Sequence, residues 1–578
     1  MAYRNLDEFL VRLEQSGELV RVKSPVHPDL ELSALTELQR TRDGGKALWF
    51  EQVEDSPFPV VVNLFGSARR MAWGLRVETL DALETRMAHL LDFHLPEGLT
   101  GMMSRAAELL GALRSAGIGV RTGGNNRARV QEVVCEGDVS SLPRVRLWPE
   151  DPPGALTHVQ LIYTHSTGQR CMTLTQAHIL DSRTLALPAS ALADLVSKTE
   201  HIPAAVVLGG DPAAMWCGMM PLPGGFDPYL AAGWLRGKPI SFTRAVSQPL
   251  DLPADAEFAI EGWLDPTDVR RIGSISSDSG FYACHIDFIP LHVTALTHAR
   301  DAIFPLHVPA RPPSAHSWML QAVERLYMPL LRLMAEDVVN MSLPAEGAGR
   351  NLAIVSINAR KPGAAQKAMF GLWGIGELAA LKVVMVVDAD VNVHDPAAVM
   401  TRVLETVDWR QDILHVKGEL HPHDFAAESR GFGGKMGIDA THKAERSPLA
   451  LIEVESSLLD TLFPGGWHRM QRVILGSGNQ PRMECVQPIW DAHPQAIIVF
   501  VDTALDLKNF SQAAWRILAN LNTSRDLIIN QHGGAAIDAT TKATDWPPAL
   551  EFPPAVIEQV QREWDIKPRS IRRSSRRK

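Results

Sequence analysis

The sequence predicts an α/β protein of several domains, and three observations lead to this fold class. The chain has 578 residues, which is too many for a single hydrophobic core. Of these residues, 46% are apolar. Helical and strand patterns alternate at the start and again in the C-terminal part, whereas the middle contains short strand patterns broken by glycine and proline. A stretch near the end occurs twice. We expect an N-terminal α/β domain, a central β-rich domain, a C-terminal α/β domain, its divergent second copy and a basic disordered tail, at 1–126, 127–335, 336–445, 446–560 and 561–578.

The N-terminal domain opens with a predicted helix. Leu6, Phe9, Leu10 and Leu13 recur at the spacing of one helix face, and Gly17 follows as a break. The remaining signals are three strand-length apolar runs and a Gly-Gly-Asn-Asn linker that closes the domain, at 19–22, 47–50, 60–62 and 123–126.

The central domain is predicted to be β-rich and barrel-like. Its clearest strand patterns are at 159–163, 205–208, 240–242 and 291–293. A helical pattern at 318–334 then leads into the first strand of the C-terminal domain, at 353–357.

The C-terminal part repeats itself. Residues 434–443 and 534–542 share the string Ile-Asp-Ala-Thr, and each copy has an upstream buried-strand pattern that ends in aspartate, at 383–388 and 497–502. A helix follows each strand, with apolar positions at a constant offset: Val399, Met400, Val403, Leu404 and Val407, then Ala513, Ala514, Ile517, Leu518 and Leu521. Two unrelated units that resemble each other by chance are the alternative, but periodicity does not require the shared string. We interpret the repeat as a duplicated domain.

Charge and composition argue against several classes of function and location. The net charge of −9 argues against general nucleic-acid binding, and the longest apolar runs are too short for a membrane span. Charged residues near the start disfavour a signal peptide, so a cytoplasmic location is expected. Five separated cysteines without a C-x-x-C pair favour reduced thiols. The basic tail is predicted to be solvated and disordered, with weak contact to an acidic partner as the alternative.

Several motifs occur in the order seen in UbiD decarboxylases, and the chain resembles that family up to about residue 445. The motifs are Asn63-Leu64-Phe65-Gly66-Ser67 with Arg70, Trp148-Pro149-Glu150-Asp151, Leu208-Gly209-Gly210-Asp211-Pro212, Glu261-Gly262, Arg311-Pro312-Pro313 and Lys435-Met436-Gly437-Ile438-Asp439-Ala440-Thr441. The second copy resembles the C-terminal extension of longer, menaquinone-pathway members.

The resemblance implies an N-terminal α/β domain, a split β-barrel like that of flavin reductases, a C-terminal α/β domain and a homo-oligomer. The implied reaction is reversible, non-oxidative decarboxylation of an aromatic or α,β-unsaturated acid, with a quinone precursor as one candidate substrate. The implied cofactor is prenylated FMN, made by a partner flavin prenyltransferase, and it acts as an electron sink. The protein has to hold the phosphate, orient the carboxylate and protonate the product.

The chain differs from the family at the positions of the family's metal ligands. Family members clamp the cofactor phosphate through a divalent ion bound by Asn, His and Glu, and these fall here at Cys171, Leu192 and Pro228. Leucine and proline side chains have no donor atom, so no divalent metal is expected at these positions. A soft zinc or copper site is the alternative, built from Cys171 and His178 with His165 or Cys217, although such residues on barrel strands are more often core residues.

The catalytic positions are substituted as well. The family's arginine falls at Gln176, which keeps hydrogen bonding but loses the fixed charge. The proton-donating glutamate falls at Ile272 and the second acidic position at Ser277. Asp278 compensates only if the register slips by one residue, which would turn its side chain to the other face of a strand.

The retained Lys-x-Gly-x-Asp string has two interpretations. The resemblance places Lys435 and Asp439, with Gln176, among the cofactor-binding candidates. Alternatively, the glycines shape a turn in which Asp439 caps the backbone and Lys435 is solvated. The second copy keeps Asp538 but has Gly534 in place of the lysine, which leaves both interpretations open.

Three functions remain from the sequence. The first is a working UbiD-type carboxy-lyase, although the substitutions argue against catalytic competence. The second is a non-catalytic subunit that supports an active UbiD homologue, and the third is a protein that binds flavin or another small ligand in the barrel cleft. Fold alone does not choose among them.

Overall fold

The computed structural model describes residues 3–42, 45–92, 99–117, 128–164, 168–195, 201–359, 361–443, 449, 452–478, 483–503, 505–542, 546–567 and 570–573. It forms two compact units. The first unit consists of Met1–Val323 together with Ala549–Lys578, and the second of Glu324–Pro548. The predicted linker at 123–126 lies outside the described residues.

The first unit begins with a small sheet in the order β1-β2-β3-β16. Strand β16 comes from much later in the chain and pairs in parallel with β3. Because β16 follows the last barrel strand in the chain, it links this sheet to the barrel. The predicted helix and strands at the start are confirmed. The elements of this region are α1 Leu6–Gln15, β1 Leu19–Val22, α2 Glu31–Arg40, β2 Ala47–Phe50, β3 Val60–Val62, α3 Ala68–Gly74, α4 Asp81–Leu90, α5 Leu99–Ala116 and β16 Phe304–Leu306.

A closed antiparallel barrel forms the centre of the first unit. Among the described residues, strands β11-β8-β5-β6-β7-β15 are neighbours in this order, and β15 pairs with β11 to close the barrel. The barrel strands are β5 Ala155–Thr164, β6 Arg170–Asp181, β7 Thr184–Pro188, β8 Ile202–Leu208, β11 Phe258–Leu264 and β15 Ile286–His298. Around them lie η1 Arg129–Gln131, β4 Val133–Cys135, η2 Ala189–Leu195, α6 Pro212–Trp216, η3 Cys217–Met219, α7 Pro228–Arg236, β9 Phe242–Arg244, β10 Asp251–Pro253, β12 Arg270–Ile272, β13 Ile275–Ser276 and β14 Tyr282–Ala283.

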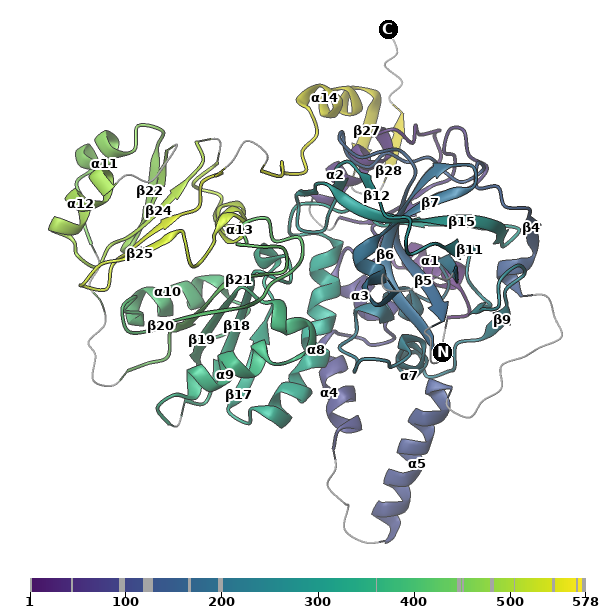
Figure 1. The fold of residues 1–578 in the computed structure, drawn as a ribbon, viewed down its shortest axis with the longest axis horizontal. Helices are drawn as coiled ribbons and strands as arrows, with labels where there is room; N and C mark the ends of the chain where they lie inside the picture. The colour runs from purple at the N-terminus through teal and green to yellow at the C-terminus, as the bar shows by residue number, and fades with distance from the viewer. Residues whose placement is uncertain are drawn as a thin grey trace. The chain divides into compact units, whose positions relative to one another are not determined.

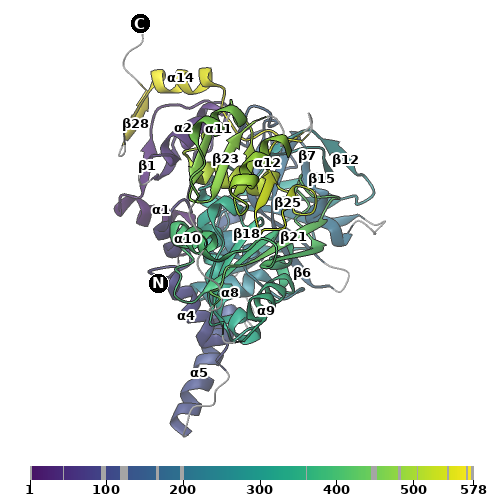
Figure 2. The ribbon, with the colours of Figure 1, turned by 90° about the vertical axis from the view of Figure 1, so that its left-hand side faces the viewer.

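The end of the chain returns to the first unit. Helix α14 (Pro554–Glu563) and the hairpin of β27 (Trp564–Lys567) and β28 (Ser570–Arg573) lie beside α2 and β1, as both views show (Figures 1 and 2). Trp564 and Ile571 are buried in the same core as the N-terminal sheet and the barrel. The predicted disorder of the tail is therefore wrong for the described residues up to 573, because apolar side chains anchor this basic segment.

The second unit contains two sheets with the same arrangement. Their orders are β17-β18-β19-β21-β20 and β22-β23-β24-β26-β25, and in both the three middle strands are parallel while the edge strands are antiparallel. The elements of the first are β17 Val338–Ser342, η4 Ala345–Gly347, β18 Leu352–Ile357, α9 Ala364–Trp373, η5 Gly376–Ala380, β19 Val383–Asp388, α10 Pro396–Thr406, β20 Ile413–Glu419 and β21 Phe432–Asp439. Those of the second are α11 Ser456–Leu462, β22 Trp467–Met470, β23 Val473–Ser477, α12 Met483–Ala492, β24 Ile497–Val501, α13 Phe510–Asn520, β25 Leu527–Ile529 and β26 Ala535–Asp538. Helix α8 (Ala315–Met334) connects the first unit to the second.

The two sheets of the second unit hold each other through matching contacts. Lys382 donates to the carbonyl oxygens of Leu518 and Leu521 at the end of α13, at 3.1 Å each. Arg472 donates to the carbonyl oxygens of Leu404 and Val407 at the end of α10, at 2.7 and 2.6 Å. These carbonyls occupy corresponding positions in the sequence repeat, and a cation at a helix C-terminus is the favourable partner for them.

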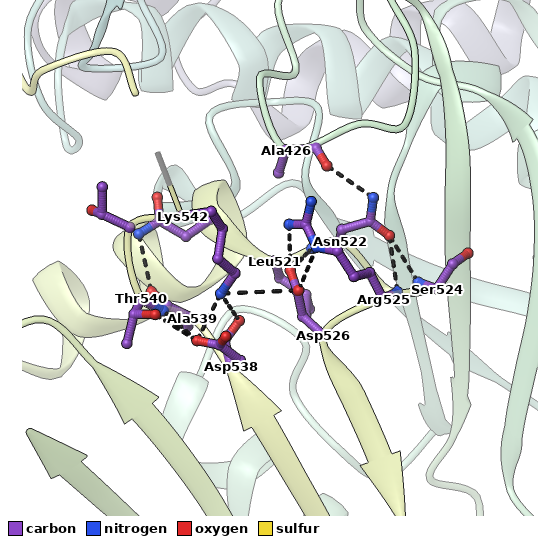
Figure 3. Close-up of polar contacts among 12 residues, drawn as sticks. Ala426, Leu521, Asn522, Ser524, Arg525, Asp526, Asp538, Ala539, Thr540 and Lys542 are labelled. Atoms are coloured by element: carbon purple, nitrogen blue, oxygen red, sulfur yellow. Dashed lines mark hydrogen bonds and ion pairs between the residues drawn. The ribbon is translucent and has the colours of Figure 1, made fainter. Parts of the chain in front are cut away.

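The repeated Ile-Asp-Ala-Thr strings also adopt the same local structure. Figure 3 shows Lys542 between Asp538 and Asp526, with its Nζ at 2.6 Å and 3.9 Å from their carboxylates. In the first sheet, Lys443 lies at 3.1 Å from Asp439 and 3.6 Å from Asp412. These ion pairs tie the end of one strand to the start of its neighbour.

Most of the strands that the sequence predicts in the central and C-terminal parts are confirmed. The segment predicted at 240–242 differs, because the strand starts only at Phe242. It pairs with β10 from Phe242 to Arg244. Within the described residues, no helix has the length and apolar character needed to cross a bilayer.

Candidate functional site

The motif Trp148-Pro149-Glu150-Asp151 holds a short hairpin in place beside the barrel. The carboxylate of Asp151 accepts hydrogen bonds from the backbone N–H of Ser276, at 2.6 Å, and of Trp148, at 3.2 Å. The hydroxyl of Tyr282 accepts from the backbone N–H of Glu150 at 3.1 Å. Because Ser276 ends β13 and Tyr282 begins β14, the motif fixes the turn between these strands, and this turn carries Asp278.

His158 reaches the same region from a bulge in β5. Leu156 pairs with Ala177 and Val159 with Thr175, so two residues of β5, Thr157 and His158, oppose one residue of β6. That residue is Gln176. His158 has a positive φ of 53°, an uncommon backbone conformation for a side chain of this size. A bulge changes the direction of a side chain, and here it turns His158 out of the regular alternation of the strand.

His307 follows β16 and is held to the same bulge. Its backbone N–H donates to the hydroxyl of Thr157 at 2.9 Å, and that hydroxyl donates to the carbonyl of His307 at 2.5 Å. The rings of His307 and His158 stack with centroids 4.0 Å apart. His316, the second residue of α8, completes the group.

Asp278 lies at the centre of these three histidines, and we call the four residues the His–Asp cluster. Its Oδ1 lies 2.6 Å from Nε2 of His307. Its Oδ2 lies 3.6 Å from Nε2 of His158 and 3.6 Å from Nδ1 of His316. The four side chains are between 7% and 19% exposed, so the cluster is mostly enclosed but solvent reaches it.

The charges in the cluster favour an ionised aspartate. Burial alone would raise the pKa of Asp278, but the imidazoles of His307 and His316 outweigh it and hold this pKa well below its usual value. Burial, together with the neighbouring His307, lowers the pKa of His158. His158 therefore favours its neutral form, which carries a free lone pair.

A small cavity of about 30 Å³ adjoins the cluster, with room for about one or two waters. His158, His307 and Thr157 line it together with the motif residues Asn63 to Phe65. Residues from two of the motifs that the sequence singles out, Asn63 to Phe65 and Leu208, thus line the cavity beside the cluster.

The resemblance assigns the family's metal ligands to Leu192, Pro228 and Cys171, and the structure shows what surrounds these three residues. Leu192 is buried, Pro228 is the first residue of α7, and Cys171 is half-buried on β6. Nearby, Arg170 pairs with Asp227, with its Nε at 3.0 Å, and lies over the ring of Phe242 at 3.7 Å. These side chains do not fit an ion that clamps a flavin phosphate.

The alternative soft site is not assembled either. Cys171 and His178 are on the same strand seven residues apart, which puts them roughly 23 Å apart and on opposite faces. His178 is buried, which lowers its pKa to about 4, and Cys217 is a buried residue at the start of η3. His165 lies outside the described residues.

The positions that the resemblance assigns to the family's catalytic groups make contacts within the first unit. Ile272 packs beside a small apolar cluster of Ile275, Ala283 and Ile286. Ser277 belongs to the hairpin turn, where its backbone N–H donates to Phe281 and its hydroxyl lies 3.2 Å from that of Ser279. Asp278 is therefore in a turn and not in a strand, so strand alternation does not determine its direction.

Lys435 and Asp439 lie in the second unit. Lys435 is buried, and its ammonium group donates to the carbonyl of Glu419 at 2.6 Å and to that of Ala379. Burial lowers its pKa to about 8. The predicted solvated lysine and the predicted turn are thus wrong, because Lys435 is buried and Gly434 and Gly437 lie within strand β21. Asp439 accepts from the N–H of Thr441 at 3.1 Å and so forms the predicted cap.

Comparison with known proteins decides the family. Three domain profiles of 3-octaprenyl-4-hydroxybenzoate carboxy-lyase match the chain: the N-terminal domain at residues 10–90, the Rift-related domain at 121–312, and the C-terminal domain at 317–440 and 477–545. The chain belongs to the UbiD family. The C-terminal profile matches parts of both sheets of the second unit.

Relatives and solved structures agree with this assignment. An uncharacterized protein of Archaeoglobus fulgidus is 34% identical over 461 residues, which are 77% of this chain and 92% of that protein. The UbiD-class enzyme HmfF of Pelotomaculum thermopropionicum, solved with FMN, has a TM-score of 0.63 at 23% identity and covers 79% of this chain and 98% of its own. The closed form of vanillic acid decarboxylase from Sedimentibacter hydroxybenzoicus has a TM-score of 0.67 at 20% identity, over 79% and 96%. These two structures share the UbiD fold with this chain.

Sequence reasoning found Asp278 but missed the three histidines around it. His158, His307 and His316 come from a bulge, a strand end and a helix start, and no fixed spacing relates them. The only signal available was their location beside family motifs: His158 follows the Trp-Pro-Glu-Asp turn, and the other two flank Arg311-Pro312-Pro313.

Proposed function

We propose that this protein is a UbiD-family homologue that does not carry out the prenylated-FMN reaction itself and acts as a non-catalytic subunit beside an active homologue. One observation carries the proposal. The positions of the family's metal ligands hold a buried leucine, a proline at the start of α7 and a half-buried cysteine. Two of the three lack a donor atom, so the chain has no means to bridge a flavin phosphate in the family's way.

The substituted catalytic positions support the same proposal. Ile272 and Ser277 cannot donate a proton to a carbanion as a carboxyl group does, and Gln176 has no positive charge with which to orient a carboxylate. Meanwhile the motifs that shape the barrel and its hairpin are retained and make specific hydrogen bonds. A non-catalytic subunit requires the family's scaffold but not its catalytic groups, and this combination fits the proposal.

A working carboxy-lyase is the second candidate, and one observation favours it. The His–Asp cluster lies directly beside Ser277 and opposite Gln176, so acid–base groups are present next to the positions that lost them. In this candidate the substrate is an aromatic or α,β-unsaturated acid, such as a quinone precursor, and an imidazole of the cluster holds the proton. HmfF has been solved with FMN, and an evolved dimeric form of it with prenylated FMN, which makes these flavins the ligands to test.

Two further expectations accompany the proposal. The matching sheet orders and reciprocal helix-end contacts of the second unit support descent of this unit by duplication. The barrel is expected to be of the split type found in flavin reductases, and the chain is expected to assemble with a copy of itself or with an active UbiD subunit.

The test is a decarboxylation assay of the full chain co-expressed with a flavin prenyltransferase, with HmfF prepared in parallel. Carbon dioxide release is measured from a panel of aromatic and α,β-unsaturated acids. We expect release by HmfF from its substrate and none above background by this chain, together with co-purification of a UbiD homologue from cells that express both. Release by this chain that requires prenylated FMN would overturn the proposal and favour the second candidate.

A further inference from the structure

The His–Asp cluster has the composition of a transition-metal site. Two imidazole nitrogens and one carboxylate oxygen, from His158, His316 and Asp278, all lie within 4.8 Å of one another. Two histidines and a carboxylate with open positions are a recurrent ligand set for zinc and for non-haem iron in proteins. None of the three occupies a position that corresponds to the family's own metal ligands.

The distances within the cluster fit an ion better than direct contacts. Oδ2 of Asp278 is 3.6 Å from both nitrogen atoms, longer than a good hydrogen bond. Ligand atoms around a tetrahedral zinc ion with bonds of about 2.0–2.1 Å stand about 3.4 Å apart. The two distances to Asp278 are therefore within a few tenths of an ångström of those around a bound ion, and the nitrogens of His158 and His316 lie within 4.8 Å of each other.

The surroundings supply the supporting shell that metal ligands need. His307 lies 2.6 Å from the other oxygen of Asp278 and stacks on His158, so it orients two of the three ligands. Asp278 is in a turn fixed by Asp151, and Thr157 links His307 to the bulge that carries His158. The adjoining cavity offers room for about one or two waters that can complete the coordination.

We propose that His158, Asp278 and His316 bind one divalent transition-metal ion, with zinc as the first candidate, and that His307 positions Asp278 for it. Since all four residues belong to the first unit, the site is independent of the second unit. The site is also independent of the proposed loss of flavin chemistry, because it uses none of the family's metal or catalytic positions.

Binding is tested with the full-length chain after dialysis against a chelator. Zinc chloride is titrated by calorimetry, and cobalt(II) is used as a spectroscopic probe. We expect one zinc per chain at the cluster and visible cobalt bands of a nitrogen- and oxygen-bound ion, without the thiolate charge-transfer band that a cysteine ligand produces. Absence of stoichiometric binding, or a cobalt spectrum dominated by thiolate, would overturn the proposal.

Variants locate the ion. His158→Gln, Asp278→Asn and His316→Gln should each weaken zinc binding by at least about 100-fold, whereas His307→Gln should weaken it by about 10–100-fold, the range seen for residues that orient ligands. Cys171→Ser and His178→Gln are matched controls and should leave the affinity unchanged. Zinc should also raise the melting temperature of the wild type and of both controls but not of the three ligand variants.

Two results from the variants would count against the site. Binding that persists in all three ligand variants would show an adventitious ion only, and binding lost in Cys171→Ser would place the ion elsewhere. If one ligand variant does not fold, as judged by circular dichroism, the other two and the cobalt spectrum of the wild type still decide the question.

Discussion

At the residue scale, the buried carboxyl group of Asp151 positions a loop, and its pKa reflects this burial. Asp151 is buried under the hairpin turn and accepts two backbone hydrogen bonds, yet burial outweighs them and raises its pKa to about 7. The sequence identified this residue only as part of a motif. Its role follows from the hairpin that it holds, and the hairpin in turn determines where Asp278 lies.

The raised pKa of Asp151 has a consequence for stability. Between about pH 4 and about pH 7 its carboxyl group is ionised in the unfolded chain but protonated in the folded one, so its contribution is complete at low pH and is lost as the pH rises. We expect Asp151→Asn to lower the denaturation midpoint, and the gap to the wild type to be smaller at about pH 7.5 than at about pH 5. The measurement is urea denaturation at both values. The exposed Asp138→Asn serves as control, and a gap that widens with pH would contradict the assignment.

At the element scale, the sequence predicts regular structure well where apolar periodicity is strong and fails where single contacts decide. The opening helix and the strand pairs of the C-terminal repeat follow from periodicity alone. The tail does not, because its basic residues mask the alternation of Trp564, Ile566 and Ile571, which face the core. In the tail, Arg573 forms an ion pair with Glu31 at 3.0 Å. The three cluster histidines were missed for a similar reason, since a bulge and a turn bring them together and neither has a spacing signature.

Removal of the tail's anchor should destabilise the first unit. Trp564 is buried against α2, and its indole N–H donates to Glu31 at 2.8 Å. We expect Trp564→Ala to cost about 3–5 kcal/mol of the free energy of unfolding, the usual range for a buried large aromatic residue. Arg572→Ala, an exposed position in the same hairpin, should cost less than about 0.5 kcal/mol. Equal midpoints for the two variants in chemical denaturation would show that the hairpin is not part of the core.

The reciprocal helix-end contacts make a second prediction at this scale. Arg472 donates to carbonyl oxygens of Leu404, Val407 and Gln495 in the second unit. Arg472→Met keeps most of the apolar volume but leaves these acceptors without their donor, so we expect a loss of about 2–4 kcal/mol. Lys508→Met, at an exposed position of the same unit, should be close to neutral. Denaturation followed by circular dichroism compares them, and a neutral Arg472→Met would show that the contacts do not stabilise the pair of sheets.

At the scale of the whole molecule, the chain has the fold of the UbiD family, and we propose that its site no longer supports the family's flavin chemistry. The family and the mixed α/β fold were predictable from the sequence because the motifs are contiguous and lie in order. The consequences of the substitutions were predictable only in part: leucine and proline exclude metal ligation at once, whereas the surroundings of Ser277 and Asp278 required the structure.

The most direct test is the cofactor content of the purified full-length chain after co-expression with a flavin prenyltransferase. Absorbance spectra and the mass of the released cofactor give its stoichiometry, and HmfF prepared in the same way is the positive control. The account predicts a folded, colourless protein with far less than one prenylated FMN per chain. One tightly bound prenylated FMN per chain would contradict it and would make this protein a flavin-dependent member of its family.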